Sequence, residues 1–415
     1  MESLLDVSNL ADAVLPLIRT RADLYRWSTA NEHGRQMHDA VEMLQAAAQT
    51  EDPAVVFAVT QKAIASALKV IMRADDSSGI IGDACRALLD LHPEVAARAT
   101  PPVTKLVDWM MTLQFDNECD YFHLDPVAYA PALGETGIAS YRAKLADVVA
   151  RLGPRPSEDK RWTGPHSGDW FSLDWNAQRL AVLDRDVGEI IRTHARDRKV
   201  AQWFLDTAEA LAEIGEFELA IDWARQALDV GPGHQSLKAG EYWCAMLAEH
   251  RPVELLAARL EVFRRWPSSS TAARLYRDVG ESWPQHRDEV MERLAVSPRD
   301  AVLFALLSLK DAEYAWQLGQ SLALDDDRTW SDLVKAYEKV DPLAVLPVLN
   351  RLVLRELVET GAQHYQIAAR RLKKMRRLAA GSEYATEIDQ FIAELREANR
   401  RRPRLQQEFD RAGLP

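Results

Sequence analysis

Acidic and hydroxyl side chains are grouped most densely in one short segment, where they could supply oxygen ligands to a hard cation. Residues Asp75–Gly79 read Asp-Asp-Ser-Ser-Gly, and Asp83 follows closely. Such oxygens suit Ca²⁺ or Mg²⁺, but the ligand order of an EF-hand is absent. Asp and Ser are also favoured helix N-caps. We therefore expect a helix that Asp83 caps and Pro93 ends, and predict no metal site here.

A second acidic segment, Phe115–Asp125, also contains Cys119 and His123. A zinc site would need further ligands from elsewhere in the chain, because one Cys and one His have no characteristic spacing. The remaining cysteines, Cys85 and Cys244, form no CxxC pair with it, so no disulfide framework is indicated either. We expect an acidic loop whose aromatic residues fill a helix interface.

Motifs of enzyme active sites are absent from the sequence. The ten histidines are scattered, and there is no Gly-x-Ser-x-Gly, phosphate-binding glycine loop or His-Glu-x-x-His. His194 and His234 lie near predicted helix ends, where a charged imidazole is mildly stabilising. The sequence therefore predicts a protein that is not an enzyme and has no catalytic residue, cofactor or metal.

Basic residues are concentrated near the C-terminus. Six of the eight residues Arg370–Arg377 are Lys or Arg, and Ala368, Leu372, Met375 and Ala379 share the opposite helix face. Clustered cations can bind phosphates by releasing counterions. The candidate nucleic-acid contacts are Arg370, Lys373, Lys374, Arg377, Arg400, Arg401, Arg402 and Arg404. The alternative is a helix that caps the array and pairs with its acidic body, which the lack of interleaved aromatic residues favours.

Length and composition are those of an ordinary protein with two or three domains. The chain has 415 residues, of which 47% are hydrophobic, and a net charge of −12. The acidic start, Met1–Asp6, does not resemble a signal peptide, and the longest apolar run, Ala301–Leu307, is too short to span a membrane. Isolated cysteines suit a reducing compartment. We expect a cytoplasmic protein without a membrane partner.

Helical periodicity is nearly continuous, and residues 201–234 resemble one tetratricopeptide unit. Gly215 follows the first helix, where a left-handed C-cap favours glycine. Small alanines, such as Ala208 and Ala220, would let two helices approach closely, and Pro232 would stop the second helix. Such a unit cannot bury its apolar face alone, so it predicts stacked neighbours.

Three segments end with the same pattern, a large apolar residue four positions before a proline. The pairs are Leu228 and Pro232, Phe263 and Pro267, and Leu294 and Pro298. Their spacing is close to the period of tetratricopeptide repeats. The predicted fold is all-α: an N-terminal helical domain (1–152), a linker containing Pro, Gly and Trp (153–169), a degenerate helical-repeat array or α-solenoid (170–363) and basic capping helices (364–415).

Apolar spacing also places the individual helices. One contains Leu10, Val14 and Ile18, with Pro16 as a kink or boundary, and others are expected around Leu44 and around Val59. A further helix is expected from Gly137 to Leu152. The aromatic residues Trp162, Trp170, Phe171 and Trp175 indicate that the predicted linker is held against a domain.

Several blocks of the sequence resemble bacterial SWIM-type zinc-finger proteins, downstream of their finger. They include Asp75–Asp83, Leu133–Glu135, the unit at 201–232, Asp341–Leu346 and the C-terminal Phe409–Leu414. The finger motif itself, with its Cys-x-Cys and Cys-x-His, is missing, so no residue inherits a zinc-ligand role. The resemblance implies a helical companion region with an interaction-related function.

The leading functional prediction is a non-enzymatic protein-interaction scaffold or adaptor. Helical-repeat arrays usually bind a protein or peptide on the face formed by the first helix of each pair. The residues predicted to contact this partner are Trp203, Glu209 and Tyr242. The alternative is a nucleic-acid-binding accessory protein that uses the basic C-terminal helices.

Overall fold

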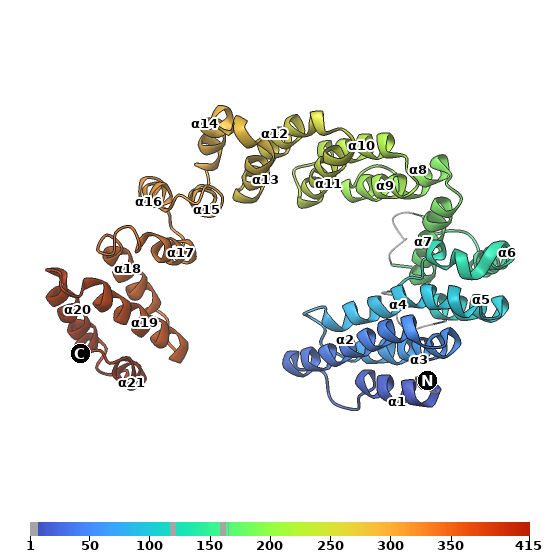
Figure 1. Ribbon diagram of the computed structural model, residues 1–415, viewed down its shortest axis with the longest axis horizontal. Coiled ribbons are helices and arrows are strands. Elements are labelled where there is room, and N and C mark those ends of the chain that lie inside the picture. Colours follow the sequence, from blue (N-terminus) through green and yellow to red (C-terminus); the bar gives the residue numbers. More distant parts are fainter. Residues whose placement is uncertain (1–6, 117–121, 158–162, 165) are drawn as a thin grey trace. The chain divides into compact units, whose positions relative to one another are not determined.

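The computed structural model describes residues 7–116, 122–157, 163–164 and 166–415, and it is all-α across these residues (Figure 1). The only strand-like pairing in these ranges is an isolated bridge between Leu24 and Ala74. The chain forms two compact units, Met1–Trp223 and Ala224–Pro415. The predicted all-α fold class is confirmed.

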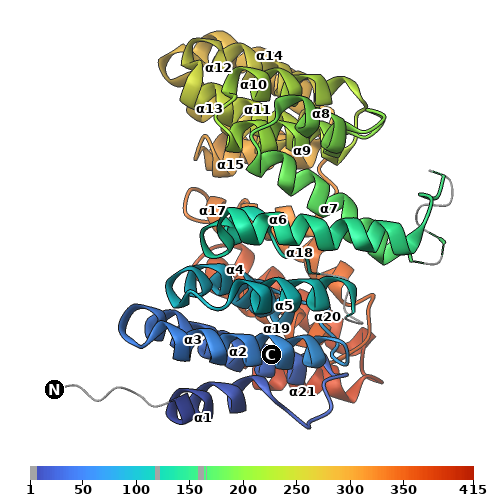
Figure 2. The same ribbon diagram turned by 90° about the vertical axis from the view of Figure 1, so that its right-hand side faces the viewer.

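The first unit contains ten helices in the described ranges, the last of which crosses into the second unit. They are α1 (Val7–Ile18), α2 (Trp27–Thr50), α3 (Pro53–Ile71), α4 (Ile80–Ala99), α5 (Val103–Phe115), α6 (Pro126–Leu152), α7 (Ser167–Leu183), α8 (Val187–Ala195), α9 (Ala201–Glu213) and α10 (Phe217–Gln226). Figure 2 shows α1 to α6 lying side by side in successive layers.

The second unit continues with shorter helices and three 3₁₀ turns. They are η2 (Ala227–Asp229), α11 (His234–His250), η3 (Pro252–Glu254), α12 (Leu255–Arg265), α13 (Ser269–Val279), η4 (Gly280–Ser282), α14 (Trp283–Leu294), α15 (Pro298–Leu307), α16 (Ala312–Ser321), α17 (Asp327–Tyr337), α18 (Leu346–Glu356), α19 (Ala362–Ala379), α20 (Tyr384–Ala398) and α21 (Pro403–Arg411).

Helices in both units pack mainly against their neighbours in sequence. In the first unit α7 contacts α8 and α8 contacts α9, and in the second α17 contacts α18 and α18 contacts α19. The first unit has a continuous core from Leu10 to Leu180, whereas the second has cores around Phe263 and around Trp330. This local packing is that of a helical-repeat array.

Helix starts follow from capping residues that precede a proline or a polar first turn. Asp52 accepts a hydrogen bond from the backbone N–H of Ala54 at 2.8 Å, with Pro53 as the first helical residue of α3. Asp125 does the same for α6, before Pro126. Ser268 forms a reciprocal capping box with Thr271 at the start of α13.

Two prolines that were predicted to end or kink helices lie inside them. Helix α1 continues past Pro16 to Ile18, and α4 continues past Pro93 to Ala99. The predicted cap at Asp83 is also wrong. Asp76 accepts hydrogen bonds from the N–H groups of Ile81 and Gly82 instead, and α4 begins at Ile80. Buried apolar residues on both sides of Pro93 hold α4 in the core, which outweighs the lost backbone bond.

Helix α6 ends at Leu152, where the predicted linker begins, and α7 starts inside the predicted linker. Helix α6 begins at Pro126 rather than Gly137, and its backbone is non-helical at Gly134. Helix α7 begins at Ser167, and Trp170 is buried in the core of the first unit. Trp162 lies outside the described residues. The first compact unit ends at Trp223, and within it α7 packs onto α6 and α5. The predicted domain boundaries stay a prediction.

The repeat unit at residues 201–234 forms the helix pair that the sequence predicts. Gly215 has a φ of +86°, the left-handed conformation expected of a C-cap glycine. Ala208 and Ala220 are completely buried between helices, and Leu228 is buried four positions before Pro232. Pro298 differs from Pro232, because it is the first residue of α15 rather than a residue between helices.

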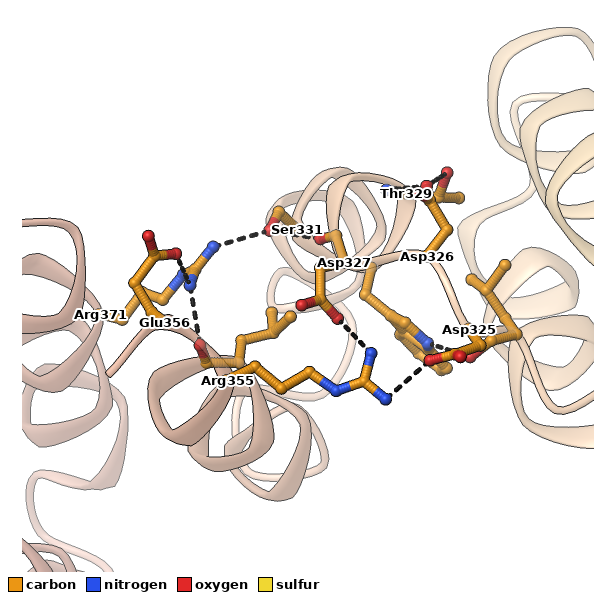
Figure 3. A network of polar contacts seen from close by, with 11 residues as sticks. Asp325, Asp326, Asp327, Thr329, Ser331, Arg355, Glu356 and Arg371 are labelled. Carbon is orange, nitrogen blue, oxygen red and sulfur yellow. Dashed lines mark hydrogen bonds and ion pairs between the residues drawn. The ribbon is translucent and has the colours of Figure 1, made fainter. Parts of the chain in front are cut away.

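Consecutive helices of the second unit are joined by arginines that bridge carboxylates (Figure 3). On α18, Arg355 pairs with Asp327 at 2.9 Å and with Asp325 at 2.7 Å. On α19, Arg371 pairs with Glu356 at 2.7 Å and also reaches Ser331. These contacts connect α17, α18 and α19, so part of the basic charge of α19 serves to hold the array together.

Helix α3 is long and apolar enough to cross a membrane by length and composition alone. Its apolar residues, including Val56, Val59 and Ala63, are buried in the core of the first unit. It packs against α1, α2 and α4. This is the environment of a core helix.

Candidate functional site

A groove on the first unit brings together two of the three residues predicted to contact a partner. It has a volume of about 460 Å³ and lies against α7, α8 and α9. A neighbouring cavity of about 320 Å³ shares Asp174, Arg196 and Trp203 with it. The other lining residues are Phe171, Trp175, Gln178, Arg179, His194, Gln202, Asp206, Glu209, Ala210 and Glu213. We call this site the α7–α9 groove.

The helical period of α9 explains which of its side chains reach the groove. Trp203, Asp206, Ala210 and Glu213 recur every three or four residues, so they share one face. The opposite face is apolar and buried, with Phe204, Leu205, Ala208 and Leu211. Burial of that face fixes the rotation of α9 and thereby presents the polar and aromatic face to the groove.

Arg179 on α7 connects three helices at one end of the groove. Its guanidinium pairs with Asp125 at 2.9 and 2.7 Å, and with Glu213 at 2.7 Å through two nitrogens. Asp125 also caps α6, so this network holds α6, α7 and α9 together. Burial lowers the pKa of Arg179, but the hydrogen bonds that it donates to Glu213 and Asp125 outweigh this effect and raise its pKa. The side chain of Arg179 is only 13% exposed, so bidentate pairing compensates its desolvation.

Aromatic rings of the groove are held in place by neighbouring groups. The guanidinium of Arg196 lies 5.2 Å from the ring centroid of Trp203, a cation–π contact. Trp175 donates its indole N–H to the carbonyl of Leu124 at 2.9 Å. Arg196 has a φ of +50°, a conformation that costs a residue with a Cβ about 1 kcal/mol or more. The α8–α9 loop therefore holds strain where Arg196 meets Trp203.

Carboxylates outnumber cations along the groove. The acidic lining residues are Asp174, Asp206, Glu209 and Glu213, whereas the basic ones are Arg179 and Arg196. Two carboxylates already neutralise Arg179. Asp206 accepts a hydrogen bond from Gln202 at 2.7 Å, and Glu209 is exposed. Asp174 pairs with Arg155, so the excess of carboxylates over cations rests on Asp206 and Glu209. The groove is therefore weakly negative and aromatic, a combination that favours a cationic ligand.

His194 is a buried histidine at the end of α8, not the charged helix-end residue that the sequence predicts. Its Nδ1 lies 2.9 Å from the carbonyl oxygen of Ile190. Burial lowers the pKa of His194, and Arg179 and Arg196 lower it further, despite that hydrogen bond. The imidazole is therefore neutral at pH 7 and adds no positive charge to the groove.

Trp203 and Glu209 both lie on α9 and line the α7–α9 groove, Trp203 half-buried and Glu209 exposed. Tyr242, the third predicted contact, is half-buried on α11 in the second unit. Arg179 and Asp206 also line the groove and were not predicted from the sequence. Arg179 pairs with a residue 54 positions away, a relation without local signal, whereas the spacing of Asp206 from Trp203 could have revealed it.

Comparison with protein families gives a match over residues 15–270, to a family of unknown function (DUF6880). The chain belongs to this family. The matched range includes α7, α8 and α9 and therefore the whole groove. Because the family has no known function, membership of DUF6880 assigns no activity to these residues.

No curated protein matches this DUF6880 chain. A solved structure described as a circular tandem repeat protein with novel repeat topology and enhanced subunit contact surfaces is similar to it, with 13% sequence identity and a TM-score of 0.15. That match covers 99% of this chain and 96% of the other. The comparisons show no link to SWIM-type zinc-finger proteins, so that resemblance stays a prediction.

The basic C-terminal residues lie on α19 and before α21. As predicted, Ala368, Leu372, Met375 and Ala379 are buried. Lys374 pairs with Glu338 at 2.6 Å and Arg377 approaches the same carboxylate at 4.0 Å. Part of the basic cluster is thus paired with carboxylates of the array. This pairing is what the alternative prediction, a helix that caps the array, requires.

The other predicted nucleic-acid contacts vary in their environment. Arg400 pairs with Glu397 at 2.7 Å, and Arg402 donates to the carbonyl of Leu357 at 3.0 Å. Arg370, Lys373 and Arg401 are exposed and have no ion pair with the described residues. Nucleic-acid binding at these helices stays a prediction.

The two acidic segments, Asp75–Asp83 and Phe115–Asp125, were considered as metal sites in the sequence. In the first, Asp76 caps α4 and Asp75 accepts the N–H of Ser77 at 3.2 Å. The second is described only in part, because Cys119 lies among residues 117–121, outside the described ranges. No group of three or more His, Cys, Asp or Glu side chains within the described ranges could hold a metal ion.

Proposed function

We propose that this chain is a non-enzymatic protein-interaction scaffold whose α7–α9 groove binds a basic peptide segment of a partner protein. The observation that carries the proposal is that Phe171, Trp175 and Trp203 share one groove with an excess of carboxylates. Aromatic rings bind guanidinium and ammonium groups over their faces, and nearby carboxylates neutralise the same cations. An apolar ligand would gain nothing from the carboxylates.

The contact between Arg196 and Trp203 supports an arginine-containing ligand in particular. This ring already accepts a guanidinium from its own chain at 5.2 Å. A partner arginine on the groove side of the ring would meet Asp206 and Glu209 from the same helix. Arg is preferred to Lys in such a site, because its planar group stacks and forms bidentate pairs.

The absence of reactive motifs and the buried cysteines support the rest of the proposal. Cys85 and Cys244 are buried free thiols, and burial raises the pKa of Cys244 to about 12, so it is a poor nucleophile. We propose that the scaffold acts in the cytoplasm, where isolated thiols stay reduced. Fractionation of the source cells tests this location, and recovery of the chain outside the cytoplasm would contradict it.

A relationship to the helical region of bacterial SWIM-type proteins is also part of the proposal. Its support is the set of sequence blocks alone. Aspartates of two blocks hold local backbone structure: Asp76 caps α4, and Asp341 accepts N–H groups of Leu343 and Ala344 at 3.0 Å in the turn before α18. These contacts give the aspartates a folding role that any relative with the same helices would share.

Peptide binding in solution tests the proposed function. Fluorescence anisotropy of labelled peptides compares a basic peptide, with Arg alternating with small residues, and its acidic counterpart, with Glu at each Arg position. We expect the full-length chain to bind the basic peptide and not the acidic one, with affinity that falls as salt rises. Equal binding of both peptides would contradict the proposal.

Variants locate the binding in the groove. Trp203→Ala should weaken binding of the basic peptide about tenfold or more, as expected of a central aromatic anchor. Glu209→Gln removes one groove carboxylate and should weaken it by a smaller factor. The matched control is Glu42→Gln, an exposed position on α2 away from the groove. If Glu42→Gln weakens peptide binding as much as Glu209→Gln does, the affinity depends only on the net charge of the protein and not on the groove.

A further inference from the structure

The turn between α1 and α2 carries exposed aromatic rings among arginines. Tyr25 is 73% exposed and Trp27 is 60% exposed, although aromatic residues are usually buried. Arg19, Arg21 and Arg26 lie in the same nine residues and are all exposed. We call these five residues, with Met72 and Arg73, the Arg19–Trp27 face. The face contains four of the chain's cations and lies around one exposed carboxylate, Asp23, which accepts the N–H of Tyr25 at 2.9 Å, although the chain as a whole carries a net charge of −12.

The fold holds this face in place from beneath. Leu24 is buried, pairs with Ala74 in a parallel bridge, and accepts the N–H of Asp75 at 2.9 Å. Arg73 donates to the carbonyl of Thr20, and Arg19 donates to Ser66 at 3.1 Å. The turn is thus fixed to the end of α3, and Met72 at that end is 49% exposed beside it.

The outer side chains of the face have no partner within the described residues. The rings of Tyr25 and Trp27 make no ring contact or side-chain hydrogen bond there, and the guanidinium groups of Arg21 and Arg26 form no ion pair. Helix α2 also begins here without a side-chain cap, so its N-terminus adds positive potential. These side chains contribute nothing visible to folding.

From these observations we propose that the Arg19–Trp27 face binds single-stranded nucleic acid. Exposed rings next to arginines fit a ligand in which flat bases alternate with phosphates: the bases stack on Tyr25 and Trp27, and the phosphates pair with Arg21 and Arg26. Bases in a duplex are stacked on each other and offer no free face to the rings, so the ligand is single-stranded.

An acidic protein segment fits the face less well. A protein interface usually buries a core of apolar side chains around its anchors. Met72 is the only large aliphatic side chain exposed among residues 19–27 and 72–75. Stacking and phosphate pairing need no such core. This binding site is independent of the α7–α9 groove, because it lies at the turn between α1 and α2 and directly after α3.

Anisotropy of labelled oligonucleotides tests the proposal with the full chain. Probes of about 12 nucleotides, oligo(dT) and oligo(U), are titrated between about 50 and 200 mM salt, together with the corresponding duplex and a Glu-rich peptide. We expect binding of the single strands that weakens steeply with salt. Absence of single-strand binding at low salt would overturn the proposal, as would tighter binding of the duplex or of the acidic peptide.

Two double variants assign the binding to the face. Tyr25→Ala with Trp27→Ala should weaken binding at least about tenfold, because each ring stacks on a base. Arg21→Ala with Arg26→Ala should lower the slope of log affinity against log salt by about 1.4, which corresponds to two phosphates. All four side chains are exposed and unpaired, so the variants should fold, which circular dichroism verifies.

The matched control removes two exposed cations from the basic C-terminal helix, Arg370→Ala with Lys373→Ala. We expect this variant to bind as the wild type does. If it loses binding and the Arg21/Arg26 variant does not, the oligonucleotide binds to α19 and the proposal is wrong. Both double variants of the Arg19–Trp27 face should bind the basic peptide as the wild type does. The proposal for this face and the proposal for the α7–α9 groove are therefore tested separately.

Discussion

The guanidinium of Arg196 covers the ring of Trp203 at 5.2 Å, so the central aromatic residue of the groove already binds a cation from its own chain. The contact links the α8–α9 loop to the first helix of the best-preserved repeat. It also shows the geometry that a partner arginine would use. Arg196 supports the ring and would compete electrostatically with the proposed basic peptide.

Replacing Arg196 should have opposite effects on stability and on binding. Arg196→Ala removes a cation–π contact, which we expect to lower the free energy of unfolding by about 0.5–1 kcal/mol. The same change removes a positive charge from a groove that is proposed to bind cations, so affinity for the basic peptide should rise. Urea denaturation and peptide anisotropy measure the two quantities. A fall in both would show that Arg196 contributes directly to the ligand site.

Loss of Arg179 should destabilise the first unit. Arg179→Leu leaves Asp125 and Glu213 without their common partner. Because the two carboxylates are 32% and 40% exposed, water offsets part of the cost, and we expect a loss of about 2 kcal/mol rather than the value of a fully buried pair. Urea denaturation, followed by tryptophan fluorescence, provides the measurement.

The matched control for Arg179 is an exposed ion pair between helices of the same unit. Lys144 on α6 pairs with Asp108 on α5 at 3.0 Å, and their side chains are 42% and 61% exposed. Lys144→Leu should cost less than about 1 kcal/mol. Similar losses for both variants would mean that the Arg179 network has no special role in joining α6, α7 and α9.

His92 should make the stability of the first unit depend on pH. Its Nδ1 lies 2.7 Å from the hydroxyl of Tyr129, its ring stacks on Trp109 at 4.3 Å, and burial lowers the pKa of His92 to about 3 from an ordinary 6.5. Between these values the unfolded chain binds a proton that the folded chain does not. The free energy of unfolding should therefore fall as pH falls below 6.5, by up to about 1.4 kcal/mol per unit, and not depend on His92 above it.

The variant His92→Phe isolates this contribution. It keeps the aromatic stack but leaves the Tyr129 hydroxyl unpaired, so its stability at pH 7 should be lower. In urea denaturation series, the free energy of unfolding of the variant should nevertheless fall less steeply between pH 6.5 and 4 than that of the wild type. Parallel slopes for the two proteins would contradict a neutral, buried His92.

Gly137 should tolerate no larger residue, because α5 and α6 approach closely there. A Cβ at this position would lie 2.8 Å from Val103 and equally close to Leu133. Gly137→Ala should therefore lower the free energy of unfolding by about 1–3 kcal/mol, despite the higher helix propensity of Ala. Gly231→Ala is the control, since nothing lies within 4 Å of its Cβ and its φ is not positive. An unchanged free energy of unfolding for Gly137→Ala would show that α5 and α6 can move apart to accept the methyl group.

The sequence was a good guide wherever a local pattern decides the structure. The pair of helices around Gly215 follows from its small residues and C-cap glycine. The partner-contact role of Trp203 and Glu209 stays a prediction. The helix end at Pro93 was predicted wrongly, because buried apolar residues on both sides of this proline outweigh its local cost.

Contacts between residues distant in sequence could not be predicted from the sequence. The pairing of Arg179 with Asp125 joins two helices across 54 positions, and neither residue has a local pattern that indicates the other. The neutral state of His194 likewise depends on burial by helices that the sequence places only approximately. The exposed rings of Tyr25 and Trp27 became recognisable only when their solvent exposure was known.

The most direct test of the basic-peptide groove is to invert its charge. The double variant Asp206→Lys with Glu209→Lys reverses two carboxylates on the groove face of α9. Anisotropy titration with the basic and acidic peptides should then show an exchanged preference: the wild type binds the basic peptide, and the variant binds the acidic one. If the folded variant still prefers the basic peptide as strongly as the wild type does, the groove is not the peptide-binding site.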